Sequence, residues 1–177
     1  MATPIVIDLL RAEQRMADAT VEALPPHGGR VLEAGRMTPV RAALLAAGAW
    51  VFDANLVEMD VQALPFRAQC FDVTYANRLF EMLDDATFYG FLQELMRVTR
   101  RRLVLHFPLG LLQSTQRMAS ASRRDPPYLH LFPQTCACLV HGGFSDVIVH
   151  DYRLTPNIII LASRPEEPHV EPRVCDA

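Results

Sequence analysis

The sequence has no Cys-x-x-Cys pair, no long apolar run and little net charge. Without paired spacing, Cys70, Cys136, Cys138 and Cys175 are expected to be free thiols in a reducing compartment. Acidic residues come too early for a signal peptide, and no apolar run reaches bilayer length, so we expect a cytoplasmic protein without a membrane span. The formal charge of -3, from 17 basic and 20 acidic residues, gives no overall attraction to nucleic acid. No nucleic-acid partner is expected.

The chain is long and apolar enough for one hydrophobic core. It has 177 residues, of which 50% are hydrophobic, so it needs neither disulfides nor a metal to fold. His141 with Cys136 and Cys138 lacks zinc-site spacing, so no metal is expected. We expect an N-terminal helix and linker at 1–27, one domain at 28–163 and a disordered tail at 164–177, because the tail is rich in proline and glutamate.

The apolar pattern predicts alternating helices and strands. Three- and four-residue spacing marks amphipathic helices, and runs of β-branched and apolar residues mark strands. The expected helices are 5–24, 38–47, 84–100, 113–127 and 133–141, and the expected strands are 31–33, 50–54, 57–59, 71–76, 103–107, 146–152 and 157–162. The alternation up to residue 107 predicts an α/β fold with a mainly parallel sheet covered on both faces, and the last two strands add an antiparallel hairpin.

Five stretches follow one another in an order that resembles a known family. They are VLEAG at 31–35, WVFDAN at 50–55, DVQALPF at 60–66, FDVTYANRLFEML at 71–83 and LQELMRVTRRRLVL at 92–105. Together they resemble the class I S-adenosylmethionine-dependent methyltransferases, of the methyltransferase type 11-like branch, over residues 28–162. The resemblance implies a Rossmann-like methyltransferase fold and S-adenosylmethionine (SAM) as cofactor.

The resemblance also implies which residues form the cofactor site. Glu33 and Gly35 belong to the first motif, and Asp53 stands where the family binds the ribose hydroxyls. Asp60 stands where the family reaches the adenine amino group. Asn77, at the end of a strand, would bind a ligand or form a turn.

Two residues are weak candidates for a catalytic base. Glu81 stands near the mouth of the site, where relatives often have histidine, but a glutamate at a helix start is the simpler interpretation. His106, like His130, could assist proton removal on the acceptor side, although a lone histidine is more often structural.

The sequence departs from the family pattern around this site. Met37 and Pro39 replace two glycines of the first loop, so a side chain intrudes where backbone should approach the cofactor. Only a few residues separate Asp53 from Val57, too few for the usual parallel crossover, so the sheet is expected to be trimmed after its second strand. No lid domain is recognised.

Two other groups of side chains allow more than one interpretation. The arginines of the run 97–102 could bind phosphate or an acidic partner, but a solvated helix end is favoured. Phe88, Tyr89 and Phe91 could belong to an interface, with core packing as the default.

Two functions follow from these observations. The favoured one is a methyltransferase-like protein that is degenerate in SAM binding and acts as a non-catalytic partner, scaffold or regulatory subunit, with a protein partner or as a homo-oligomer. The alternative is an active SAM-dependent methyltransferase that acts on a small-molecule acceptor, by holding donor and nucleophile in line.

Overall fold

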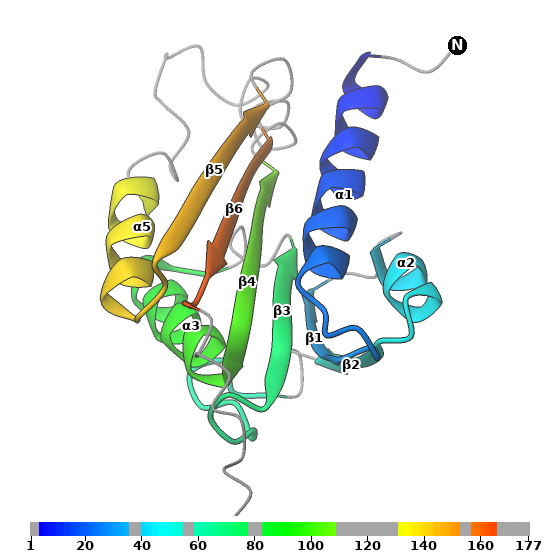
Figure 1. The fold of residues 1–177 in the computed structure, drawn as a ribbon. Helices are drawn as coiled ribbons and strands as arrows, with labels where there is room; N and C mark the ends of the chain where they lie inside the picture. Colours follow the sequence, from blue (N-terminus) through cyan, green and yellow to red (C-terminus); the bar gives the residue numbers. More distant parts are fainter. Residues whose placement is uncertain are drawn as a thin grey trace, which may run out of the picture.

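Six strands form one mixed sheet in the order β2-β1-β3-β4-β6-β5 (Figure 1). The computed structural model describes residues 4–35, 40–54, 59–77, 83–108, 131–152 and 157–165. The strands are β1 Arg30–Gly35, β2 Trp50–Ala54, β3 Phe71–Asn77, β4 Thr99–Pro108, β5 Asp146–Tyr152 and β6 Asn157–Ser163. β1 to β4 are parallel, whereas β6 is antiparallel to β4 and β5. The predicted parallel sheet with an antiparallel C-terminal hairpin is confirmed.

Helices cover both faces of this sheet. They are α1 Pro4–Glu22, α2 Val40–Ala46, α3 Asp85–Val98 and α5 Leu131–His141. α1 and α2 lie on one face, and α3 and α5 lie on the other (Figure 1). The Asp84 side chain caps α3 by accepting a 2.8 Å hydrogen bond from the Thr87 N–H, as its place before the apolar run predicts.

Each face of the sheet has its own hydrophobic cluster. The cluster under α3 and α5 contains Phe88 and Phe91, so the core interpretation of these two aromatic residues is confirmed. Tyr89 is half-buried, and its hydroxyl donates a 2.6 Å hydrogen bond to Gln134. The cluster under α1 and α2 joins Met16 of α1 to Tyr75 of β3. The helix that precedes the sheet thus shares its core.

The interpretation of the arginine run as a helix end was wrong for Arg100, Arg101 and Arg102, whereas Arg97 does lie in the last turn of α3. α3 ends at Val98, and β4 begins at Thr99 instead of residue 103. Arg100 pairs with Asp72 at 2.7 Å, and Arg102 donates to the Ser163 hydroxyl at 2.9 Å. The physical reason is pairing with β3, which extends the strand back to the β-branched Thr99.

Arg164 ties the ends of two helices to the sheet. Its guanidinium donates to the carbonyls of Met96, Thr99 and Gly142 at 2.9, 3.2 and 3.0 Å. The ring of Phe144 lies 4.4 Å away. Burial lowers the pKa of Arg164. These contacts satisfy carbonyl groups near the C-terminal ends of α3 and α5.

Some expected features lie outside the described residues. These are the loop residues 36–39, most of the strand 57–59, the helix 113–127, Glu81, His130 and the tail beyond 165. Met59 is described, but it lies in a bend. Among the described strands, β2 is therefore the last one on its side of the sheet.

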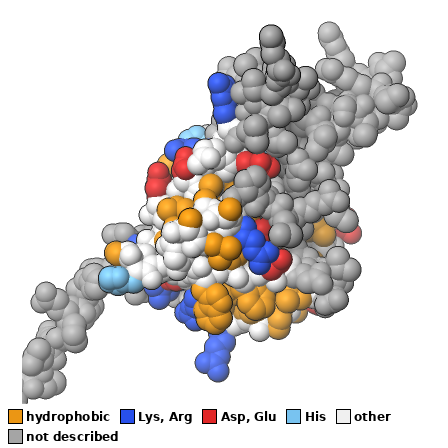
Figure 2. Space-filling model, turned by 90° about the vertical axis from the view of Figure 1, so that its right-hand side faces the viewer, with side chains coloured by type: hydrophobic (Ala, Val, Ile, Leu, Met, Phe, Trp, Pro, Cys, Tyr) orange, Lys and Arg blue, Asp and Glu red, His pale blue; other side chains and the backbone are white. Residues whose placement is uncertain are grey.

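Large apolar side chains remain exposed on the side of α2 and β2. Trp50 is 75% exposed, Leu45 56% and Phe52 42%. Figure 2 faces this side of the molecule and shows apolar side chains gathered in its lower part. No helix in the described part of the chain is long and apolar enough to cross a membrane.

Candidate functional site

Parallel pairing brings the predicted site residues to one end of the sheet. Glu33 of β1 lies opposite Asp53 of β2 and Tyr75 of β3. Two positions further along, Gly35 lies opposite Asn77, which in turn lies opposite His106 of β4. Residues in register and two apart share a face, so these side chains point to the face that α1 and α2 cover. The structure thus brings Glu33, Asp53, Asn77 and His106 to one end of the sheet.

Arg41 joins the acids of two neighbouring strands. Its Nη1 donates to Asp53 Oδ2 at 2.9 Å, and its Nε lies 3.6 Å from Glu33 Oε2. The hydrogen bond to Asp53 raises the pKa of Arg41, burial opposes this, and the charges of Glu33 and Asp53 add to the rise. Arg41 is therefore always a cation here.

Burial differs sharply between the members of this cluster. The side chain of Glu33 is 1% exposed, that of Arg41 27% and that of Asp53 43%. A buried carboxylate is costly unless cations or hydrogen bonds compensate it. Arg41 supplies such a cation to Glu33 from α2. Asp53 holds the outer side of the guanidinium in place.

Gly35 has a structural reason to be glycine. Its φ is +123°, and a Cβ atom there would lie 2.1 Å from the carbonyl oxygen of Asn77. No side chain fits at that distance, so glycine lets the end of β1 approach the end of β3. The retained glycine is therefore explained by strand packing, without reference to a ligand.

Asn77 and His106 form a buried pair at the same end of the sheet. His106 Nδ1 lies 2.7 Å from Asn77 Oδ1, and the residues are 0% and 2% exposed. An amide oxygen only accepts, so Nδ1 carries the proton and donates it. This fixes the orientation of the imidazole ring, as a structural histidine or a ligand-facing one would require.

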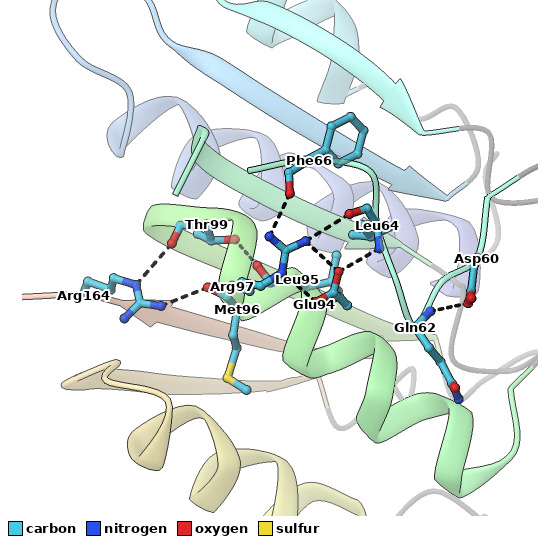
Figure 3. Close-up of polar contacts among 10 residues, drawn as sticks. All are labelled: Asp60, Gln62, Leu64, Phe66, Glu94, Leu95, Met96, Arg97, Thr99 and Arg164. Atoms are coloured by element: carbon cyan, nitrogen blue, oxygen red, sulfur yellow. Dashed lines mark hydrogen bonds and ion pairs between the residues drawn. The ribbon is translucent and has the colours of Figure 1, made fainter. Parts of the chain in front are cut away.

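Asp60 stabilises the turn in which it lies. Its Oδ1 accepts a 2.9 Å hydrogen bond from the Gln62 N–H, and the residue is exposed (Figure 3). Short polar side chains form such turns without any ligand. The structure does not bring Asp60 into the cluster around Arg41 by any contact among the described residues.

Two residues of α3 hold the rest of the 60–66 motif. Glu94 Oε2 accepts from the Leu64 N–H at 2.7 Å, while Arg97 donates to the carbonyls of Phe66 at 2.7 Å and Leu64 at 3.0 Å (Figure 3). Glu94 and Arg97 also pair with each other at 2.7 Å. The hydrogen bond from Arg97 lowers the pKa of Glu94, burial opposes this, and the Leu64 N–H lowers it further.

Sequence reasoning missed Arg41. Its signal was its position, because it stands two residues after Pro39 and therefore in the first turn of the helix that follows the Glu33 strand. A long cation at that point lies over the carboxyl ends of β1 and β2. Within the described residues, no group of histidine, cysteine, aspartate or glutamate side chains could hold a metal ion.

Solved methyltransferases share this fold. The magnesium protoporphyrin IX methyltransferase of Synechocystis, with bound S-adenosylhomocysteine (SAH), matches with a TM-score of 0.63 at 17% identity, over 93% of this chain and 89% of that one. The 1,6-didemethyltoxoflavin-N1-methyltransferase of Burkholderia thailandensis, with bound 1,6-didemethyltoxoflavin and SAH, matches at 0.60 and 14%, over 88% and 79%. A SAM-dependent methyltransferase from Archaeoglobus fulgidus matches at 0.58 and 14%, over 89% and 94%. At these identities the likeness shows the fold alone.

A family model matches about half of the sequence. The model of the methyltransferase domain family matches residues 19–106, which include the whole Arg41 cluster. No curated protein matches the sequence. Residues 19–106 match a methyltransferase domain, and the chain has the fold of SAM-dependent methyltransferases, as its motifs predict.

Contacts within the chain involve the acids at this edge that the resemblance assigns to SAM. The acids that the resemblance assigns to the ribose and the adenine are Asp53 and Asp60, and both already accept hydrogen bonds from this chain. SAM carries a positive sulfonium group, and the Arg41 cation lies between Glu33 and Asp53. A cation at this place disfavours a second positive charge beside it.

Proposed function

We propose that the protein is a degenerate member of the methyltransferase fold that has lost tight SAM binding and acts as a partner, scaffold or regulatory subunit. The observation that carries this proposal is the contact of Arg41 with Asp53 and Glu33. Through this contact, a cation of the chain itself pairs with Asp53, the acid that the resemblance assigns to the ribose hydroxyls. The replacement of two loop glycines by Met37 and Pro39 supports the same conclusion from the sequence.

The exposed side of α2 and β2 supports a role in protein association. Leu45, Trp50 and Phe52 are large apolar side chains, and each is more than two-fifths exposed. Apolar groups that gather on one side of a monomer often mark an interaction site.

Calorimetric titration with SAM and with SAH tests this function. We expect no heat of binding at millimolar ligand. Micromolar affinity, which corresponds to about -8 kcal/mol, would contradict the proposal. Circular dichroism of the titrated sample shows that the protein is folded in either case.

The second candidate is an active methyltransferase with a small-molecule acceptor. The Asn77–His106 pair supports it, because a buried imidazole held by an amide is suited to face a ligand at the end of the sheet. The Burkholderia thailandensis relative acts on a small molecule, which agrees with this class of acceptor. If this candidate is right, Asp53→Ala should lower SAM affinity, while Asp60→Ala should do so only if the 60–66 turn reaches the cofactor.

A further inference from the structure

The outer edge of β2 offers backbone groups to another strand. Trp50 N–H donates to the Gly29 carbonyl at 2.8 Å, so Trp50 directs its backbone groups toward β1. These directions alternate along a strand, so Phe52 and Ala54 also face β1, while Val51 and Asp53 face away from it. No described strand pairs with this outer edge.

The edge lacks the usual protection against pairing. Natural edge strands carry lysine, proline or bulges that discourage contact with other chains. β2 reads WVFDA, without lysine or proline, and its register with β1 is regular over all its residues. Its one charge, on Asp53, is paired with Arg41.

Rigid aromatic groups lie beside this edge. Phe52 packs edge-on against Phe66 with ring centroids 5.1 Å apart, and Phe66 packs in the same way against Phe71. Trp50 lies on the same face of β2 and is 75% exposed. Figure 2 shows the apolar surface on this side of the molecule. Aromatic groups that are already held in place lose little entropy when they become buried.

We propose that β2 pairs antiparallel with β2 of a second copy, about a two-fold axis at Phe52, so that one sheet continues through a homodimer. The outward groups of Val51 and Asp53 stand symmetrically about Phe52. Val51 then exchanges both backbone hydrogen bonds with Asp53 of the partner subunit, and Phe52 lies opposite its own copy. Pairing at β2 does not require that the cofactor site be lost.

Side-chain size favours a second copy over an unrelated strand, and charge does not oppose it. In this register the large Trp50 lies opposite the small Ala54 of the partner subunit, twice by symmetry. The two Asp53 carboxylates come near each other, but each is already paired with its own Arg41. The contact is therefore self-complementary in hydrogen bonds and side-chain size, and each carboxylate near the axis is compensated within its own subunit. It also adds a strand beyond β2, where the sheet was expected to be trimmed.

Sedimentation over a range of protein concentrations tests the dimer. We expect a reversible dimer at micromolar concentration. Phe52→Lys places two like charges in direct opposition and should shift the transition at least about tenfold to higher concentration. Val149→Lys is the control, because Val149 is 45% exposed on β5 at the other edge of the sheet. Trp50→Ser changes a more exposed site and should also weaken the dimer. It replaces Phe52→Lys as the test if Phe52→Lys fails to fold.

A cysteine at the axis tests the register. Directly opposed residues of a non-hydrogen-bonded pair can form a disulfide, so Phe52→Cys should give a covalent dimer under mild oxidation. Trp50→Cys should not, because the two copies of residue 50 lie four positions apart, about 13 Å. The unchanged chain gives the background from its native cysteines, and peptide mapping identifies the crosslink.

Each other outcome overturns the proposal. If the protein is a monomer at all concentrations, β2 does not pair with a second copy, and its outer edge could pair only with a strand of a different protein. A dimer that survives both Phe52→Lys and Trp50→Ser, or one that Val149→Lys dissociates, would use another surface. Crosslinking of the Trp50→Cys variant as readily as of the Phe52→Cys variant would exclude this register.

Discussion

The guanidinium of Arg41 stands where a methyltransferase would present acids to its cofactor. We expect Arg41→Gln to bind SAH measurably, with a dissociation constant at least about tenfold below the millimolar limit expected for the unchanged chain, because it frees Asp53 Oδ2 and removes the internal cation. The gain should be larger for SAM, because only SAM carries the sulfonium charge that Arg41 would repel. Calorimetric titration of both ligands measures the two gains.

Arg67→Gln is the matched control for this experiment. Arg67 is exposed and lies in the turn after Phe66, so its loss removes the same charge without touching Glu33 or Asp53. Equal affinities in Arg41→Gln and the unchanged chain would mean that something other than the cation blocks the site. A larger gain for SAH than for SAM would exclude charge repulsion as the cause.

The positions of the acids could be predicted, but their partner could not. Glu33 and Asp53 end two buried strands, and parallel strands end on the same edge, so their proximity followed from the pattern. Arg41 approaches from α2, whose direction relative to the strands is set by packing in the core. A contact between a long side chain and two strands needs that direction, which hydrophobic spacing does not give.

Because the 60–66 motif is held by Glu94 and Arg97 of α3, the free energy of unfolding should depend on pH in the acidic range. The folded-state pKa of Glu94 lies below its ordinary value, chiefly because Arg97 donates to it. Its contribution is therefore complete above the unfolded pKa of about 4.5 and is lost as the pH falls through the lower folded pKa. We expect Glu94→Gln to cost about 1 kcal/mol at neutral pH, since the pair is partly exposed.

Urea denaturation across the acidic range measures this dependence. The difference in unfolding free energy between Glu94→Gln and the unchanged chain should shrink as the pH falls below about 4.5. Glu13→Gln on α1 is the control for general loss of negative charge. A difference that stays constant down to low pH would mean that the glutamine only disturbs packing against Leu64.

At the level of helices and strands, the sequence predicted an element correctly where its local pattern allowed only one interpretation. β2 and the start of α3 follow from a short apolar run and from the Asp84 cap, and both lie where predicted. The start of β4 was wrong by four residues, because three arginines look like a helix end until Asp72 and Ser163 pair with two of them. Long-range pairing overrode local preference there.

The order of the last two strands also needed tertiary information. A hairpin of β5 and β6 was predicted, but either strand could have joined β4. β6 does so, with Ile159 opposite His106, and β5 lies outside it. The apolar run at 158–162 is buried, as an inner strand should be, whereas Ile148 and Val149 of β5 are exposed.

The core shared by α1 and the sheet argues that the described chain unfolds as one unit. Met16 is fully buried in the cluster that contains Tyr75, Val104 and Ile159, so α1 forms one wall of that core. We expect Met16→Ala to lower the unfolding free energy by about 2–5 kcal/mol. Gln14→Ala, at an exposed position of the same helix, should change it little.

Two spectroscopic probes distinguish one folding unit from two. Far-UV circular dichroism follows the helices, and near-UV circular dichroism follows buried aromatic groups such as Tyr75. If α1 belongs to the core, both signals of Met16→Ala should fall together at one lower urea concentration. If residues 1–27 behaved as a separate element, part of the far-UV signal would be lost first, while the near-UV transition stayed where it is in the unchanged chain. That result would show that α1 unfolds independently of the sheet. It would contradict the conclusion that Tyr75 and Val104 need the residues before β1 in order to be buried.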